Sequence, residues 1–456
     1  MAKYSLVPEA TPAIETRYRN ICTDLPVPES LPIFRMLEES ESPSMMGQPP
    51  IVWHRADGFQ VFDRWGNRWI DWSSGVIIAN AGHGREEIRE ALREVIDRSL
   101  LLSYCFVHEQ RAELCHELAA ISPDPAEYRV FLLSTGSEAC ENTIKLARTW
   151  GLNRHGPRKR MIIGFENAFH GRTLGAQLAG GMQGQKQWIV GEGSTFAQVP
   201  FPDGYYCEDT SFDLFLKTLE QKEIAPEDIA GVITETFQGA GASFMPVAYA
   251  QQLEAFCRQH DIVLIMDEVQ AGFGRSGKMF SFEHYGIKPD LIACGKGITS
   301  SLPLSAVIGR QELLSLYAPG AMTSTHSASP LPVAAALANL RIIQRDGLVE
   351  NSRRLGDILH PELQRIQERY PDVLGCVHGK GLVAGIMIAK RGSHWTPDPD
   401  TALKLNWACI KRGVMMTAPV GTYGECHKVA PPLMINEEAL RESIGAYAEA
   451  CEEVLG

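Results

Sequence analysis

Apolar residues in the middle of the chain follow two alternating patterns. Short apolar runs alternate with longer stretches that have helical spacing. This alternation predicts a mainly parallel sheet with helices on both faces. The predicted strands are Val130–Leu133, Met161–Phe165, Gly231–Thr234, Ile262–Met266 and Leu291–Ala293. The predicted helices are Arg85–Leu102, Glu109–Ile121, Ser137–Trp150, Ala248–Gln259 and Ala334–Gln344.

The pattern is different near the N-terminus. Residues 1–50 are rich in Pro, Ser and Glu and predict an extended arm that packs on something larger. Residues 51–72 alternate apolar and polar positions, with two glycine turns, which predicts a short meander. We therefore expect three parts: 1–70 as the arm and part of a small domain, 71–340 as a large domain, and 341–456 as the C-terminal small domain.

Composition and net charge limit the classes of partner that this protein is expected to bind. The net charge of −12 argues against nucleic acid and anionic membranes as main partners, but a small anionic ligand remains compatible with it. The 11 cysteines are scattered singly, which predicts neither a disulfide framework nor a metal site and favours the cytoplasm. No apolar run has the length of a membrane span. We therefore expect a cytoplasmic protein that acts on small molecules.

One glycine-rich segment matches a nucleotide-binding pattern. Gly272, Gly274 and Gly277 have the spacing G-x-G-x-x-G. The glycines do not directly follow the apolar run, no helix-forming stretch comes after them, and Met279 stands where a P-loop needs Ser or Thr. An irregular loop is therefore the favoured interpretation.

A second segment is a better candidate for an anion site. Ser134–Glu138 follows an apolar run and opens a predicted helix, where free backbone N–H groups bind anions. Gly136 allows close approach of the backbone, and Ser137 adds a hydroxyl. An ordinary capping box formed by Thr135 and Glu138 is the alternative.

A lysine and an aspartate also follow predicted strands. Asp267 comes directly after Ile262–Met266, and Lys296 comes shortly after Leu291–Ala293, between two glycines. Ligands collect at the carboxyl ends of parallel strands. A lysine there can form a Schiff base with a carbonyl cofactor, and a nearby carboxylate can pair with a protonated ring nitrogen. A structural Asp–Lys ion pair is the alternative.

Taken together, seven segments resemble the motifs of class III aminotransferases. They occur in family order between about residues 70 and 430. The resemblance implies the fold type I of pyridoxal 5′-phosphate (PLP) enzymes, an α/β fold with a large domain, whose mainly parallel mixed sheet is flanked by helices, and a smaller α+β domain. The segments are STGSEACENTIKLAR (134–148), FHGRT (169–173), ETFQGAG (235–241), MDEVQAGFGRSG (266–277), CGKGI (294–298), THSASP (325–330) and GKGL (379–382).

The resemblance implies roles around the cofactor ring. Lys296 would carry PLP as a Schiff base and move the proton, and Asp267 would contact the ring nitrogen. Gln270 would lie near the ring hydroxyl, and Phe169 would stack on the ring, although Phe169 could also be an ordinary core residue. Glu235 would support these contacts.

The resemblance also implies a phosphate site shared between subunits. Gly136 and Ser137 would hold the phosphate, and Thr325 would reach the phosphate of a second subunit. We therefore expect a homodimer with active sites at the interface, or a tetramer of two dimers. Thr325 as a plain turn residue is the alternative.

The expected activity is a ping-pong transfer of an amino group to a 2-oxo acid, pyruvate or 2-oxoglutarate. Arg172 matches an arginine that, in relatives acting on 4-aminobutyrate, holds the remote carboxylate. The resemblance thus favours an ω-amino acid or amine donor, such as 4-aminobutyrate, β-alanine or taurine. A structural ion pair of Arg172 is the alternative.

Two positions depart from the family pattern. Lys428 stands where many members have an arginine that binds the α-carboxylate, and Ala240 replaces a gating glutamate. A lysine offers a point charge rather than a fork. Two other activities of the family are alternatives, namely a dialkylglycine-type decarboxylase and an aminomutase. A catalytically silent PLP-fold protein that only binds is an alternative of a different class.

Overall fold

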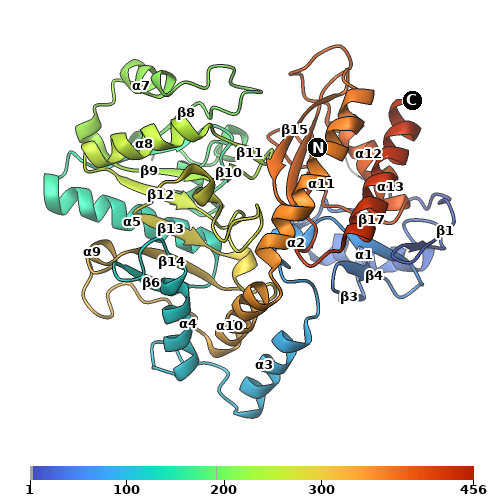
Figure 1. Cartoon of the computed structure of the whole chain (residues 1–456), viewed down its shortest axis with the longest axis horizontal. Coiled ribbons are helices and arrows are strands. Elements are labelled where there is room, and N and C mark those ends of the chain that lie inside the picture. The colour runs from blue at the N-terminus through green and yellow to red at the C-terminus, as the bar shows by residue number, and fades with distance from the viewer. Residues whose placement is uncertain (1–3, 192) are drawn as a thin grey trace. The chain divides into compact units, whose positions relative to one another are not determined.

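The computed structural model describes residues 4–191 and 193–456. The chain forms two compact units (Figure 1). One consists of the described residues up to Arg85 together with Glu350–Gly456, and the other of Glu86–Val349. We call them the split unit and the central unit.

The central unit contains a seven-stranded sheet in the order β6-β14-β13-β12-β9-β7-β8. Strand β14 runs antiparallel to both of its neighbours, and the remaining neighbours pair in parallel. The predicted mainly parallel mixed sheet is therefore confirmed. Its strands are β6 (Tyr128–Leu133), β7 (Met161–Phe165), β8 (Phe196–Val199), β9 (Ile229–Glu235), β12 (Val263–Asp267), β13 (Leu291–Cys294) and β14 (Ser305–Arg310), and β10 (Phe237–Gln238) and β11 (Ser243–Phe244) form a separate hairpin.

The central strands of this sheet are buried along their whole length, which indicates that other elements cover both faces. Every residue of β9, β12 and β13 is buried, so neither face of these strands meets solvent. The helices of the unit are α3 (Glu86–Asp97), α4 (Glu109–Ala120), α5 (Gly136–His155), α6 (Leu174–Ala179), α7 (Phe212–Gln221), α8 (Val247–Gln259), α9 (Gln311–Leu314) and α10 (Pro330–Arg345). Helix α5 packs on β9, β12, β13 and β14, and α8 packs on β12.

The split unit combines two smaller sheets with helices, an α+β arrangement. Its first sheet has the order β1-β2-β5-β4-β3 with β17 paired to β5, and its second has the order β15-β16-β18. The strands are β1 (Ile14–Glu15), β2 (Asn20–Ile21), β3 (Arg55–Asp57), β4 (Gln60–Phe62), β5 (Arg68–Asp71), β15 (Leu374–Lys380), β16 (Val383–Ile388), β17 (Val414–Met415) and β18 (Cys426–Val429). The helices are α1 (Leu31–Ser40), α2 (Ser74–Ile77), α11 (Leu348–Arg369), α12 (Pro399–Lys411) and α13 (Glu437–Leu455).

The unit boundaries fall later than the expected positions 70 and 340. The later C-terminal boundary has a packing reason, since α10 packs on α3 and α4 and therefore belongs to the central unit. The arm also differs from the expectation of extended chain, because α1 is a helix of ten residues with Pro32 in its first turn, where proline is tolerated. The side chain of Met36 in this helix is 65% exposed.

The Gly272–Gly277 segment forms turns and bends, and a short 3-10 helix, Ser281–Tyr285, follows it after three residues, where no helix was expected. The favoured interpretation as an irregular loop is therefore confirmed. The buried Glu268 accepts hydrogen bonds from the backbone N–H groups of Ser281 (2.8 Å) and Phe282 (2.9 Å), which fixes the chain after the loop. Burial raises the pKa of Glu268 to about 7.

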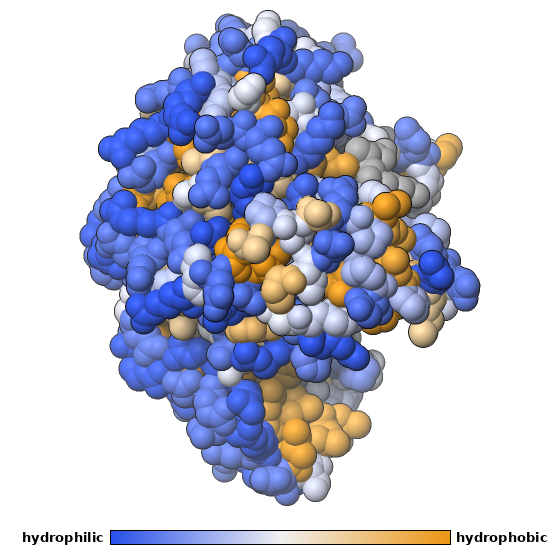
Figure 2. Space-filling view, turned by 90° about the vertical axis from the view of Figure 1, so that its right-hand side faces the viewer, coloured by the Kyte–Doolittle hydropathy of each residue, from blue (hydrophilic) through white to orange (hydrophobic). Residues whose placement is uncertain are grey.

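The surface is mostly hydrophilic with separate apolar patches, as the face in Figure 2 shows. Within residues 4–191 and 193–456, no helix is both long and apolar enough to span a bilayer. One apolar stretch in the central unit stands out by exposure, namely Leu101 (53%), Leu102 (70%), Phe106 (77%) and Val107 (85%). Apolar side chains gathered in this way commonly mark an interaction surface.

Candidate active site

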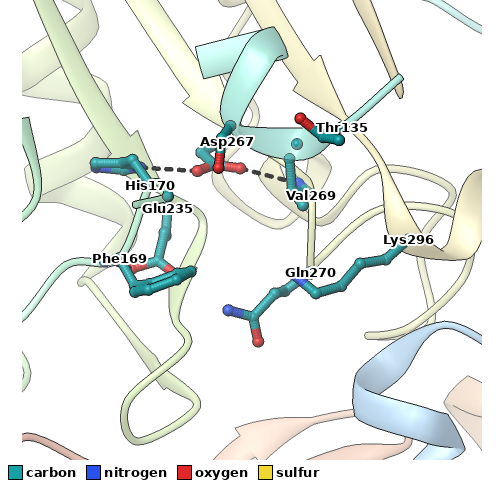
Figure 3. A pocket seen from close by; sticks show the side chains of 11 residues that line it. Thr135, Phe169, His170, Glu235, Asp267, Val269, Gln270 and Lys296 are labelled. Carbon is teal, nitrogen blue, oxygen red and sulfur yellow. Dashed lines mark hydrogen bonds and ion pairs between the residues drawn. The ribbon is translucent and has the colours of Figure 1, made fainter. Parts of the chain in front are cut away.

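A cavity of about 150 Å³ lies in the central unit (Figure 3). It is formed where the chain leaves the strands of the large sheet. Residues from five separated segments line it: Thr135, Gly136, Ser137, Phe169, His170, Gly171, Glu235, Asp267, Val269, Gln270 and Lys296. Most of the residues singled out from the sequence are thus brought together: Gly136, Ser137, Phe169, Glu235, Asp267, Gln270 and Lys296.

Asp267 and Lys296 meet because their strands are parallel neighbours. Asp267 is the last residue of β12 and pairs in register with Ala293 of β13. Lys296 follows β13 and has a positive φ of 42°, a strained conformation for a lysine that is often found at functional sites. Burial lowers the pKa of Lys296, while Asp267 acts in the opposite direction. A larger share of this amine is therefore neutral, and so nucleophilic, than in an ordinary lysine.

Three donors surround the carboxylate of Asp267. The backbone N–H of Val269 donates to Oδ1 at 3.0 Å, and Nδ1 of His170 lies 2.7 Å from Oδ2. The thiol of Cys140 donates to the same Oδ2 at 3.4 Å. Hydrogen bonds of this kind favour the charged form of a carboxylate. Asp267 can therefore present a negative charge inside the protein, where an unsupported charge would be costly.

His170 and Cys140 were not predicted from the sequence to be residues of this site. His170 lies inside the FHGRT motif, so its position beside Phe169 was an available signal. Its Nε2 is buried and has no hydrogen-bond partner among the described residues. The ligand atoms of Cys140, His170 and Asp267 lie within 4.8 Å of one another and could also hold a metal ion, a grouping that no spacing in the sequence indicated.

Glu235 lines the cavity and holds two backbone segments in place. Its Oε2 accepts the backbone N–H of Phe169 at 2.9 Å, and its Oε1 accepts that of Gly239 at 2.9 Å. Burial raises the pKa of Glu235. Gly239 also has a steric role, because a Cβ at this position would lie 2.2 Å from Nε2 of Gln270. A side chain at position 239 would therefore displace the amide of Gln270, which lines the cavity.

The N-terminus of α5 forms one end of the cavity. Thr135 caps the helix, and the predicted capping box is present, since the Thr135 hydroxyl accepts from Glu138 N at 3.2 Å while Glu138 accepts from Thr135 N at 2.9 Å. The N–H groups of Gly136 and Ser137 precede the first intrahelical bonds and are available to an anion. The capping box therefore leaves these two N–H groups open to an anion.

Three predicted residues do not line the cavity. Arg172 is exposed, and its guanidinium carbon lies 5.7 Å from the ring centroid of Phe169. Thr325 is exposed in a turn before α10. Lys428 lies on β18 of the split unit, so its contact with substrate stays a prediction.

The donor set of the cavity fits PLP. It combines an amine for a carbonyl carbon, a supported carboxylate for a protonated ring nitrogen, an aromatic wall, and a helix N-terminus for a phosphate. A Cβ on Gly136 would lie 2.8 Å from Cγ1 of Val269, so glycine is required where the helix meets the cavity.

Known proteins with similar sequences and structures agree with this chemistry. The model of the class-III aminotransferase family matches residues 42–451. The 4-aminobutyrate aminotransferase of Mycobacterium leprae is 32% identical over 93% of this chain and 96% of its own. The alanine/serine racemase of Pyrococcus horikoshii is 31% identical over 89% of this chain and 86% of its own. A PLP-bound amine transaminase from an uncultivated Pseudomonas species is 26% identical with a TM-score of 0.81, covering 91% of this chain and 97% of its own. The family resemblance found in the motifs is thereby confirmed, and the chain belongs to the PLP-dependent class-III aminotransferases.

Proposed function

We propose that this enzyme moves the amino group of an ω-amino acid or amine, such as 4-aminobutyrate, β-alanine or taurine, to pyruvate or 2-oxoglutarate. The observation that carries the proposal is the meeting of Lys296, Asp267 and the free N-terminus of α5 in one cavity. The similarity to a 4-aminobutyrate aminotransferase supports the donor class. Each half-reaction releases its product before the next substrate binds, so ping-pong kinetics are expected.

The proposal gives separate roles to five residues of the cavity. Lys296 holds the cofactor and, once released by the amine donor, moves the proton at the reacting carbon. Bound PLP supplies an electron sink. With PLP bound, Asp267 would keep the ring nitrogen charged, Gln270 would contact the ring hydroxyl, and Phe169 would stack on the ring. Glu235 holds the backbone of Phe169 in place.

The proposed phosphate site needs a residue from a second subunit, so the proposal includes a homodimer. Gly136 and Ser137 bind the phosphate in one subunit, and Thr325 of the second subunit completes the site. The exposure of Thr325 and of the apolar stretch with Phe106 (77% exposed) is what such an interface requires. A tetramer of two such dimers is the alternative assembly. All 11 cysteines, which lie among the described residues, are free, in keeping with a cytoplasmic location.

Substrate choice rests on Arg172 in this proposal. Its guanidinium lies beside the Phe169 ring and suits a planar carboxylate or a sulfonate. Lys428 stands where many family members have the arginine that binds an α-carboxylate. Ala240 stands where relatives have the gating glutamate. We therefore expect weaker recognition of α-carboxylates than of remote ones.

The Arg172→Ala variant tests the donor class. We expect kcat/KM for 4-aminobutyrate to fall about tenfold or more, since a charged hydrogen bond is lost. We expect no change for butylamine, which has the same chain without the carboxylate. The measurement is the loss of the lysine-linked absorbance of the wild type and the variant with each donor. An equal fall for both donors, or no fall, would remove Arg172 from donor recognition.

The same donor assay separates the family's other activities. Loss of absorbance followed by recovery on adding pyruvate or 2-oxoglutarate is the result expected of a transaminase. Carbon dioxide release would identify a decarboxylase, and a product formed without any acceptor would identify an aminomutase. The chain is also similar to an alanine/serine racemase. If an α-amino acid loses its optical activity in the absence of an acceptor, the activity is racemisation instead.

Gly136→Ala is expected to weaken PLP binding about tenfold or more, because the added Cβ would lie 2.8 Å from Cγ1 of Val269, which lines the cavity, and such overpacking costs about 1–3 kcal/mol. The measurement is a PLP titration of the apoprotein. Gly445→Ala is the matched control, because a Cβ there, within α13, meets nothing within 4 Å. Gly445→Ala should leave the affinity for PLP unchanged. An equal loss of PLP affinity in both variants would contradict a role of Gly136 in binding the cofactor.

A further inference from the structure

Cys140 links α5 to the carboxylate of Asp267. It is fully buried, one turn after Gly136 on the same face of the helix. Its Sγ lies 3.4 Å from Oδ2 of Asp267, within the distance for a hydrogen bond from sulfur. The helix whose first N–H groups face the cavity thus also reaches the carboxylate at the end of β12.

The thiol can act here as a donor. A carboxylate oxygen accepts hydrogen bonds and does not donate them, so at 3.4 Å the S–H of Cys140 is the donor and Oδ2 of Asp267 is the acceptor. The same Oδ2 also receives Nδ1 of His170 at 2.7 Å, so two side chains from different segments fix one oxygen.

We propose that Cys140 is a positioning residue for PLP chemistry, whose thiol orients Asp267 and stabilises its charge toward the ring nitrogen. The inference rests on the proposed role of Asp267. With two donors on Oδ2 and the Val269 N–H on Oδ1, rotation of the carboxylate would break at least one bond. Removing the thiol leaves Oδ2 to His170 alone among these side chains and makes the carboxylate a weaker partner for a cation.

Core packing is the competing explanation, since Cys140 also belongs to the apolar cluster between α5 and the sheet. The two explanations differ in what a substitution changes. Loss of packing lowers the melting temperature. Loss of a donor to Asp267 also changes the affinity for PLP and the pH at which the lysine-linked chromophore titrates, because a charged ring nitrogen lowers the pKa of a nearby protonated nitrogen.

The test compares Cys140→Ala, which removes the donor, with Cys140→Ser, which keeps one. PLP affinity of the apoprotein, the pH titration of the holoenzyme chromophore, kcat and KM are measured together with the melting temperature. We expect Cys140→Ala to weaken PLP binding about three- to tenfold and to move the chromophore midpoint upward by several tenths of a pH unit. Cys140→Ser should restore both values to near those of the wild type.

Two further variants make the outcome decisive. Cys257→Ala removes another buried thiol, in α8, and should lower the melting temperature alone. If Cys140→Ala behaves like Cys257→Ala, Cys140 is a packing residue and the inference fails. If Asp267→Asn also leaves PLP affinity and the chromophore unchanged, the proposed role of Asp267 fails as well, which separates the two failures.

Discussion

Replacing Lys296 with alanine is expected to remove the lysine-linked absorbance of the holoenzyme and to lower turnover by about a thousandfold or more. The reason is that one amine performs two tasks, holding the cofactor and transferring the proton. Burial lowers the pKa of Lys296, so its neutral form is available for both. Absorbance spectra, kcat with an amine donor, and peptide mapping after borohydride reduction measure the effect.

Lys186 provides a demanding control for this prediction. It is also a partly buried lysine of the central unit, and burial lowers its pKa to about 8. Its Nζ donates to the carbonyl of Leu178 at 3.0 Å, and it does not line the cavity. Lys186→Ala should therefore keep the absorbance and the turnover. A borohydride label on Lys186 would show that a lowered pKa alone, rather than the geometry at residue 296, selects the reactive lysine.

The predictable part of the site follows from where strands end. Apolar runs before Asp267 and Lys296 indicate buried strands, and parallel neighbours bring their carboxyl ends to one edge. The helix opening at Gly136 could be predicted for a similar reason, since a capping box marks its start. In each case the evidence lies within a few residues of the functional side chain.

The rest depends on contacts between distant segments. Cys140 lies 127 residues before Asp267 in the chain, and His170 lies 97 residues before it, so no local pattern connects them. A buried cysteine is in addition an ordinary core residue by type. The helix α1 was missed because its proline-rich, polar surroundings favour an extended chain by composition, although proline is compatible with the first turn of a helix.

Asp267→Asn is expected to reduce turnover about a thousandfold while the protein still folds. Asparagine keeps the size of the side chain but not the charge that would hold the ring nitrogen protonated, so the cofactor loses most of its capacity to accept electrons. The free N–H groups at the start of α5 are unchanged, and we therefore expect PLP to bind more weakly rather than not at all. The measurements are kcat, PLP affinity, and the rate of bleaching in a single turnover.

Asp290→Asn is the control, because it alters a second, partly buried aspartate beside the same sheet but outside the cavity. Asp290 accepts the backbone N–H of Leu264 at 2.8 Å and pairs with Arg310. Both variants lose an acceptor and should lose about 1–3 kcal/mol of unfolding free energy. Only Asp267→Asn should lose turnover, because Asp267 and not Asp290 lines the cavity with Lys296. An equal fall in turnover for both variants would mean that the charge of Asp267 serves the fold rather than the cofactor.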